Sequence, residues 1–221
     1  MKQWIGIGDI HNNVSQMEHI PEFIHADGII IHGDITNMGD YNTAASMISQ
    51  ISQKNAHIFA QAGNMDSLDI QAYLDKKTHT IHCKGIEICP GVGLMGVGLS
   101  SPTPFQTPGE VPDAQLGEWL EETWKHIQNM PHTIVVTHDP PFGTKLDTIS
   151  GGGHVGSQAV LAFIEKHQPD ILLCGHIHEA RGTDTIGQTK AVNPGLFAEG
   201  GYALIQYDQG ALDIVFKTIN Q

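Results

Sequence analysis

The segment ILLCGHIHE, residues 171–179, decides the fold of this chain. Its apolar run follows Asp170 and is typical of a strand buried on both faces, as in a parallel sheet. Gly175 lets the backbone leave this strand sharply, and His176 and His178 follow at its carboxyl end. Residues i and i+2 of an extended segment point to the same side, so we expect the two imidazoles to reach adjacent metal ions.

The same pattern, a short apolar run that ends in polar side chains, recurs along the chain. The other runs are residues 4–8, 28–32, 57–60 and 133–137. Ligands of open α/β sheets bind outside the carboxyl ends of the strands, so we expect the polar side chains to converge there. The candidate metal ligands are Asp9, His11, Asp34, Asn64, His138, His176 and His178. Seven donors exceed the need of one ion, whereas two ions that share a bridging carboxylate would use them all.

Helical patterns alternate with these strands and predict an α/β fold. We expect helices over residues 14–24, 41–53, 114–128 and 155–167, and a further helix near residue 67 that is capped by Asp66. Short β-like runs fill residues 78–100, with a hairpin turn at Lys84–Gly85, and return after residue 181. Because the sequence shows no repeat or linker, we expect one domain over residues 1–221.

Composition narrows the class of protein. The formal net charge is −13 over 221 residues, which disfavours a protein that grips nucleic acid through its phosphates. The chain has 14 histidines but a single arginine, Arg181, and this excess of imidazole favours metal binding. The first residues form no charged-then-apolar leader, and residues 86–99 are too interrupted by glycine to span a membrane. We therefore expect a cytoplasmic protein without a stable nucleic-acid or membrane partner; a homo-oligomer is compatible with the sequence.

Five ordered motifs resemble those of the calcineurin-like metallophosphoesterases. They are DIH at residues 9–11, GD at 33–34, GNMD at 63–66, His138, and GHIH at 175–178. The resemblance extends over nearly the whole chain, and VNPG at residues 192–195 is similar to the turn that follows the last motif in small prokaryotic members. It implies a four-layer α/β/β/α sandwich of two mixed sheets that acts as a di-metal phosphoesterase.

Carried over position by position, the resemblance also implies roles for the seven candidate ligands. Asp9, His11 and His178 would bind the first ion. Asn64, His138 and His176 would bind the second, with Asp34 as the bridge and Asn64 also touching substrate. A donor set of imidazole, carboxylate and amide without thiolate suits Mn, Fe, Zn or Ni. Such enzymes are expected to use a hydroxide that bridges the ions to attack a small phosphodiester or nucleotide-like phosphate.

One position departs from the family pattern. Met65 stands where many members have a histidine that resembles a general acid, and a thioether cannot donate a proton. His154, after the glycines of residues 151–153, is our candidate proton donor, although an exposed loop histidine is the alternative. The missing donor favours phosphodiesters or anhydrides with activated leaving groups over alkyl phosphate monoesters.

Two further alternatives stay open. Arg181 is a candidate phosphate contact, but an ion pair with Glu179 or Asp184 is equally compatible with its position. The chain as a whole would also fit a scaffold protein that kept the fold and lost catalysis. A scaffold would tolerate the loss of a metal ligand, and none is missing, so we favour the enzyme.

Overall fold

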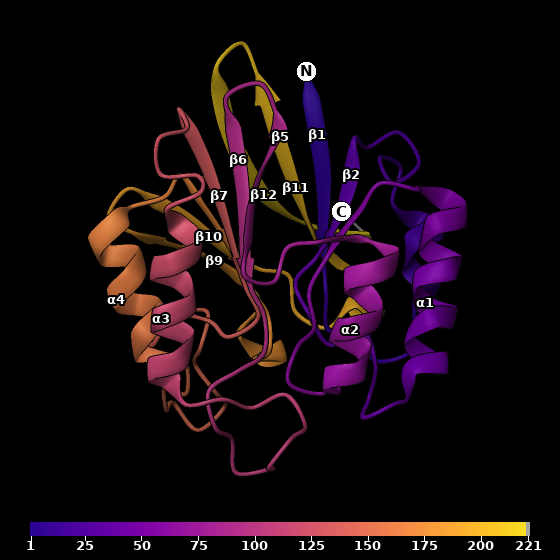
Figure 1. Ribbon diagram of the computed structural model, residues 1–221, viewed down its shortest axis with the longest axis horizontal. Helices are drawn as coiled ribbons and strands as arrows, with labels where there is room; N and C mark the ends of the chain where they lie inside the picture. Colours follow the sequence, from indigo (N-terminus) through magenta and orange to yellow (C-terminus); the bar gives the residue numbers. More distant parts are fainter. Residues whose placement is uncertain (220–221) are drawn as a thin grey trace.

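Two mixed sheets of six strands form the centre of the structure, a computed structural model that describes residues 1–219 (Figure 1). The first sheet contains, in spatial order, β12 (Ala211–Thr218), β11 (Gly201–Asp208), β1 (Lys2–Ile7), β2 (Gly28–Ile31), β3 (Ile58–Ala60) and β4 (His79–Thr80). The second contains β5 (Lys84–Cys89), β6 (Val92–Val97), β7 (His132–Thr137), β8 (Ile171–Leu173), β10 (Thr189–Asn193) and β9 (Gly182–Ile186). Strands β1 to β4 run parallel, as do β6, β7, β8 and β10.

Four helices cover the outer faces of the two sheets. In Figure 1, α1 (Tyr41–Lys54) and α2 (Leu68–Lys77) lie outside the first sheet, and α3 (Asp113–Trp124) and α4 (Gln158–His167) lie outside the second. Short 3-10 helices η1 (Ser15–His19), η2 (His178–Ala180) and η3 (Phe197–Glu199) lie in the connections. This arrangement confirms the four-layer α/β/β/α sandwich. Within residues 1–219, no helix has both the length and the apolar character needed to cross a membrane.

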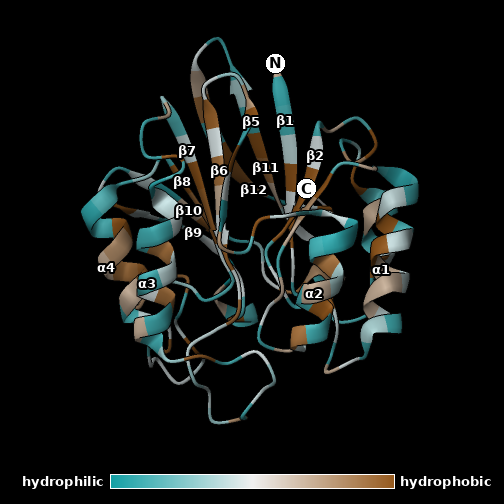
Figure 2. Cartoon of the chain, in the orientation of Figure 1, coloured by the Kyte–Doolittle hydropathy of each residue, from teal (hydrophilic) through white to brown (hydrophobic). Residues whose placement is uncertain are grey.

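Three apolar layers hold the four structural layers together. Because side chains alternate along a strand, β2 contributes to two of them. Ile29 and Ile31 pack in the layer that contains the inner face of α1, whereas Ile30 packs between the sheets with Ile134 of β7. Figure 2 shows brown along much of the strands and teal on parts of all four helices. Both faces of each sheet are therefore covered, as the apolar runs predicted.

The prediction of a helix over residues 14–24 is wrong. Only Ser15–His19 form a helix, of the 3-10 type, and Ile20 is extended with φ −92° and ψ 109°. Pro21 explains this, because its ring disfavours the helical conformation of the residue before it. Val14, Met17 and Ile20 are nevertheless buried, in the same apolar layer as Ile29 and Ile31.

Three other boundaries also differ from the sequence-based expectation. Lys84 and Gly85 do not form a turn but begin β5, and the turn lies instead between β5 and β6, where Gly91 has φ +85°. α3 ends at Trp124 instead of residue 128. α4 begins at Gln158, not at residue 155, because the Ser157 side chain accepts a hydrogen bond from the Val160 amide and so caps the helix.

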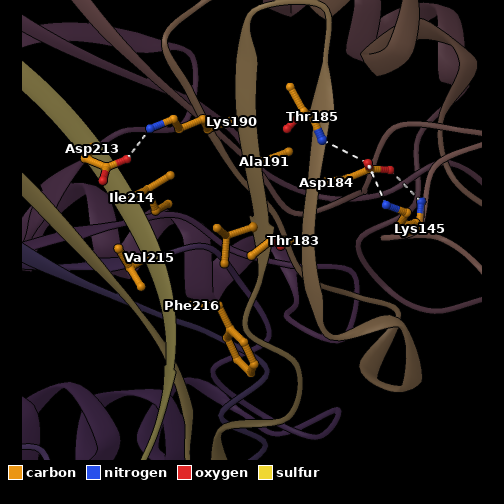
Figure 3. A pocket seen from close by; sticks show the side chains of 11 residues that line it. Lys145, Thr183, Asp184, Thr185, Lys190, Ala191, Asp213, Ile214, Val215 and Phe216 are labelled. Carbon is orange, nitrogen blue, oxygen red and sulfur yellow. Dashed lines mark hydrogen bonds and ion pairs between the residues drawn. The ribbon is translucent and has the colours of Figure 1, made fainter.

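A groove of about 580 Å³ lies where β9 and β10 approach β12 (Figure 3). Each of its four charged side chains has an oppositely charged partner: Lys190 lies 2.6 Å from Asp213, and Lys145 lies 3.7 Å from Asp184. The groove is lined by none of the seven candidate metal ligands. The candidate site must therefore be sought elsewhere, at the carboxyl ends of the parallel strands.

Candidate metal centre

The seven candidate ligands lie at the carboxyl ends of five strands from both sheets. Asp9 and His11 follow β1, Asp34 follows β2, Asn64 follows β3, His138 follows β7, and His176 and His178 follow β8. Six of them form two groups whose ligand atoms lie within 4.8 Å of one another, Asp9 with His11 and His178, and Asp34 with His138 and His176. Asn64 joins the second group, because its Oδ1 lies 2.8 Å from Nε2 of His138.

Asp34 lies between the two groups. Its Oδ2 is 3.7 Å from Nε2 of His11, and its Oδ1 is 3.4 Å from Nε2 of His138. In the first group, Nε2 of His178 lies 3.2 Å from Oδ1 of Asp9 and 3.1 Å from Nε2 of His11. One carboxylate oxygen of Asp34 thus faces each group, which is the arrangement that a bridging ligand needs.

The backbone around these side chains is strained. Four candidate ligands have positive φ angles although none is glycine: 46° at Asp9, 43° at His11, 50° at Asp34 and 69° at His176. Such conformations are uncommon, cost free energy, and gather at functional sites where the surrounding structure enforces them. The extended geometry expected for residues 176–178 is therefore wrong, since His176 is left-handed and His178 begins η2. Their rings nevertheless lie in the two adjacent groups.

Glycine is required where the chain passes close to the buried carboxylates. A Cβ atom on Gly63 would lie 2.2 Å from Oδ1 of Asp34. A Cβ atom on Gly175 would lie 2.2 Å from the ring of His32 and 2.5 Å from Oδ2 of Asp9. The glycines of the GNMD and GHIH motifs therefore make space for the acidic side chains.

The electrostatics of the centre suit a cation. Burial opposes the charged form of Asp9, but a hydrogen bond with His178 and the nearby imidazoles hold the pKa of its carboxyl well below its usual range. Burial likewise lowers the pKa of His138, yet the carboxylate of Asp34 outweighs this and raises that pKa to about 9. Burial holds the pKa of His176 at about 4, so its ring is neutral and free to donate a lone pair. The salt bridges found for Asp9 and Asp34 among residues 1–219 are to histidine alone. Two buried carboxylates that favour positive charge, beside imidazole nitrogens that can bind a metal ion in place of a proton, fit divalent metal ions.

A cavity of about 410 Å³ opens above both groups. It is lined by His11, Asp34, Asn37, Met38, Asn64, Met65, Phe105, Thr107, His176 and His178. Met65 therefore lies in the cavity wall, at the position where the resemblance implies a histidine in many family members. No Lys or Arg among the described residues lines this cavity.

Asp66 does not cap α2, contrary to the expectation from sequence. Ser67 stands at that cap, and the fully buried Asp66 carboxylate accepts hydrogen bonds from four donors in two loops. These donors are the amides of Ile35, Thr36 and Gly63 and the hydroxyl of Thr36, at 2.9–3.0 Å. Asp66 thus ties the loop that carries Asp34 to the loop that carries Asn64.

The sequence did not reveal two supporting side chains. Asn193, the first polar residue of the VNPG turn, is fully buried and donates from Nδ2 to the carbonyl of Ile177 at 2.9 Å, which fixes the segment between the two histidines. Thr107 accepts a 2.9 Å hydrogen bond from Nδ2 of Asn64 and so orients its carboxamide. An Asn before Pro-Gly indicates only a turn, and Thr107 lies in a loop whose sequence has no periodicity.

His154 and Arg181 are not brought to the centre. Nδ1 of His154 bonds to Oδ1 of Asp147 at 2.7 Å, and its ring packs against Phe142. Arg181 pairs with Glu199 at 2.9 Å, and not with either of the acids considered from the sequence. Neither side chain lines the cavity above the two groups. Their proposed roles, as proton donor and phosphate contact, stay predictions.

Comparison with known proteins identifies the family. The family model described as metallophosphoesterase, calcineurin superfamily, matches residues 116–215. The uncharacterized protein MJ1162 of Methanocaldococcus jannaschii is 30% identical over 195 residues, which cover 86% of each chain. The chain belongs to the calcineurin superfamily of metallophosphoesterases. This family is one of metal-dependent phosphoesterases, and the matched residues include His138, His176 and His178 of the two donor groups.

Solved structures share the metallophosphoesterase fold at low sequence identity. The crystal structure of TT1561 of Thermus thermophilus superposes with a TM-score of 0.71 over 99% of both chains, at 16% identity. A 5'-nucleotidase from Candida albicans SC5314 superposes with a TM-score of 0.57, over 99% of this chain and 51% of that chain, at 14% identity. At these identities the likeness concerns the fold.

Proposed function

We propose that this metallophosphoesterase uses two divalent ions to hydrolyse a small phosphodiester. The observation that carries the proposal is the position of Asp34, with one carboxylate oxygen toward each group of donors. In the proposal, Asp9, His11 and His178 hold one ion, and His138, His176 and Asn64 hold the other. Two such ions, when bound, supply Lewis acidity toward the phosphate and lower the pKa of water. Mn, Fe, Zn and Ni all suit the donor set.

The residues of the chain have separate tasks in this scheme. The strained loops after β1, β2 and β8 fix the donors before substrate arrives, so no reorganisation is needed during the reaction. Thr107 holds Asn64 so that its Oδ1 faces the second group, as a ligand must. The cavity leaves His11, Asn64, His176 and His178 accessible to a phosphate group.

The charge of the phosphate group and the presence of Met65 together favour a diester substrate over a monoester. A phosphate monoester carries up to two negative charges near pH 7, whereas a diester carries one. The cavity lining offers no Lys or Arg within residues 1–219 to meet the second charge, and Met65 offers no proton to a poor leaving group. Diesters or anhydrides with activated leaving groups are therefore the proposed substrates, and a nucleotide-like phosphate is the other class considered.

The test compares two phosphate esters, a diester and a monoester, that release the same leaving group. Metal-stripped protein is reloaded with Mn, Ni, Zn or Mg, and its hydrolysis of bis(4-nitrophenyl) phosphate and of 4-nitrophenyl phosphate is followed by release of nitrophenolate. We expect activity only after reloading, and a higher kcat/KM for the diester. Faster turnover of the monoester would reject the diester assignment. Tight binding of metal without turnover of either ester would favour the scaffold interpretation.

A separate variant tests His154 as the proton donor. His154 is 39% exposed and lies outside the cavity lining, so we expect His154→Gln to keep kcat for the activated diester within about threefold. Loss of a true general acid costs about 10²–10⁴-fold, most visibly with a poor leaving group. The measurement is therefore the ratio of variant to wild-type kcat on a 4-nitrophenyl and on an alkyl diester. A large loss confined to the alkyl diester would establish His154 as the donor.

The remaining expectations from sequence stay proposals. We infer one domain, a cytoplasmic location and no stable nucleic-acid or membrane partner from the acidic composition and the sequence pattern. A homo-oligomer is compatible with this proposal and is tested by the mass of the metal-loaded protein in solution.

A further inference from the structure

A second cavity of about 540 Å³ adjoins the one above the metal ligands. The two share Phe105 and His176 in their linings, so they lie side by side. The second cavity lies between the loop of residues 101–105, the loop of residues 149–155 and the start of η2. A phosphate above His176 would therefore lie at the border of the second cavity.

The wall of this second cavity is mainly apolar. Its lining contains Pro102, Pro104, Phe105, Ile149, Val155 and Ile177. Phe105 is 82% exposed and Val155 is 42% exposed, although apolar side chains of this size gain free energy by burial. An exposed apolar patch that borders a polar centre is typical of a ligand site.

Buried carboxylates hold both loops in place. Asp139, 1% exposed, accepts hydrogen bonds from the amide and hydroxyl of Ser101 at 2.8 and 2.6 Å. Asp147, fully buried, accepts from the amides of Gly143 and Gly156 at 3.0 Å and bonds to His154. These bonds anchor the start of the first loop and the two ends of the second, which reduces the ordering that a bound ligand requires.

We propose that this second cavity binds the uncharged, apolar alcohol part of the phosphoester whose phosphate lies above the metal ligands. The inference rests on the proposed function and specifies its substrate class: a phosphate ester of an apolar alcohol. Among residues 1–219, neither cavity is lined by Lys or Arg, and Glu179 is the acidic side chain of the second, so a further phosphate is disfavoured. The hydroxyls of Ser101 and Thr103 also line this cavity, but they already donate to Asp139 and Glu110. A nucleobase would therefore bury several hydrogen-bonding groups mainly against apolar side chains, which is unfavourable.

The test measures binding and does not depend on turnover. Manganese-loaded protein is titrated with methyl-, butyl- and hexylphosphonate, which share one charged head, and the heat of binding gives Kd. Each buried methylene contributes about 0.8 kcal/mol, so Kd is expected to fall about fourfold for each carbon added. Equal affinity for the three phosphonates would overturn the second cavity as a subsite.

Two valines of equal exposure supply a matched pair of variants. Val155 lines the second cavity, and Val215 lines the groove beside β12, and each is 42% exposed. We expect Val155→Ser to weaken hexylphosphonate binding about five- to tenfold and to leave methylphosphonate unchanged, because only the longer chain reaches the serine. Val215→Ser should change neither. Equal effects of the two variants would contradict the subsite.

The outcomes separate the subsite from the proposed function. If methylphosphonate binds and the activated diester is hydrolysed, but affinity does not depend on chain length, the subsite is wrong and the phosphodiesterase stands. If the loaded protein neither binds a phosphonate nor hydrolyses either ester, the proposed function fails and the subsite fails with it.

Discussion

The Asp34→Asn variant is expected to lose about a thousandfold in kcat toward the activated diester, the largest effect on activity that we predict. Asp34 is 2% exposed and has a carboxylate oxygen facing each group of donors, at 3.7 Å from His11 and 3.4 Å from His138. An amide keeps the shape of the side chain but has one ligand oxygen and no charge, so it would hold one ion at most. The measurement is kcat at saturating Mn, with metal content from elemental analysis of the same sample.

Met65 complicates the interpretation of that variant, because its amide donates to Oδ1 of Asp34 at 2.8 Å and this bond must survive. The asparagine keeps an oxygen that can accept it, which makes Asp34→Asn more informative than Asp34→Ala. Asp213→Asn is the matched control, since this acid lies in the groove beside β12 with Lys190 as its partner. Metal content near two ions per chain with unchanged kcat in Asp34→Asn would refute the bridging role. A loss of activity equal to that of Asp213→Asn would do the same.

The short apolar runs predicted strands correctly, because a short segment that is apolar throughout is typical of a parallel strand covered on both faces. Five of the parallel strands were expected from such runs, and the polar residues that follow those strands do meet at one edge. What sequence could not supply is the local path of the backbone. Positive φ angles at Asp9, Asp34 and His176 arise from contacts with distant segments, such as the hydrogen bond from the Asp9 amide to the carbonyl of Gly33.

The wrong predictions from sequence have identifiable causes. The apolar spacing of residues 14–24 was helical, but Pro21 disfavoured a helix and tertiary packing used the same positions in a 3-10 turn. Asp66 precedes a helix as a capping residue does. Its carboxylate instead accepts a hydrogen bond from the amide of Ile35, 31 residues away. The role of His154 stays a prediction, although buried Asp147 holds a ring that the glycines of residues 151–153 had made look mobile. The first error thus has a local cause, proline, and the second has a contact distant in sequence.

Asp66→Ala is expected to lower the free energy of unfolding by about 3–5 kcal/mol, the largest effect on stability that we predict. The substitution removes the acceptor of four hydrogen bonds in a fully buried position. Buried donors left without a partner cost about 1–3 kcal/mol each, and partial relaxation reduces the sum. Urea unfolding followed by circular dichroism measures the effect, and with an m-value of about 2–3 kcal/mol/M the midpoint should fall by about 1–2 M.

Asp69→Ala is the matched control for this variant, because Asp69 lies three residues further on, is exposed and bonds to Ser67 alone among the described side chains. Its midpoint should stay within about 0.3 M of the wild type, as expected for an exposed position. The two loops that Asp66 joins carry Asp34 and Asn64, so its loss should also weaken metal binding at urea concentrations where the chain is still folded. Equal midpoints for the two variants would show that these loops are held by other contacts. In that event the geometry of the centre would depend on the strands and on Asn193, and Asn193→Ala would become the more damaging substitution.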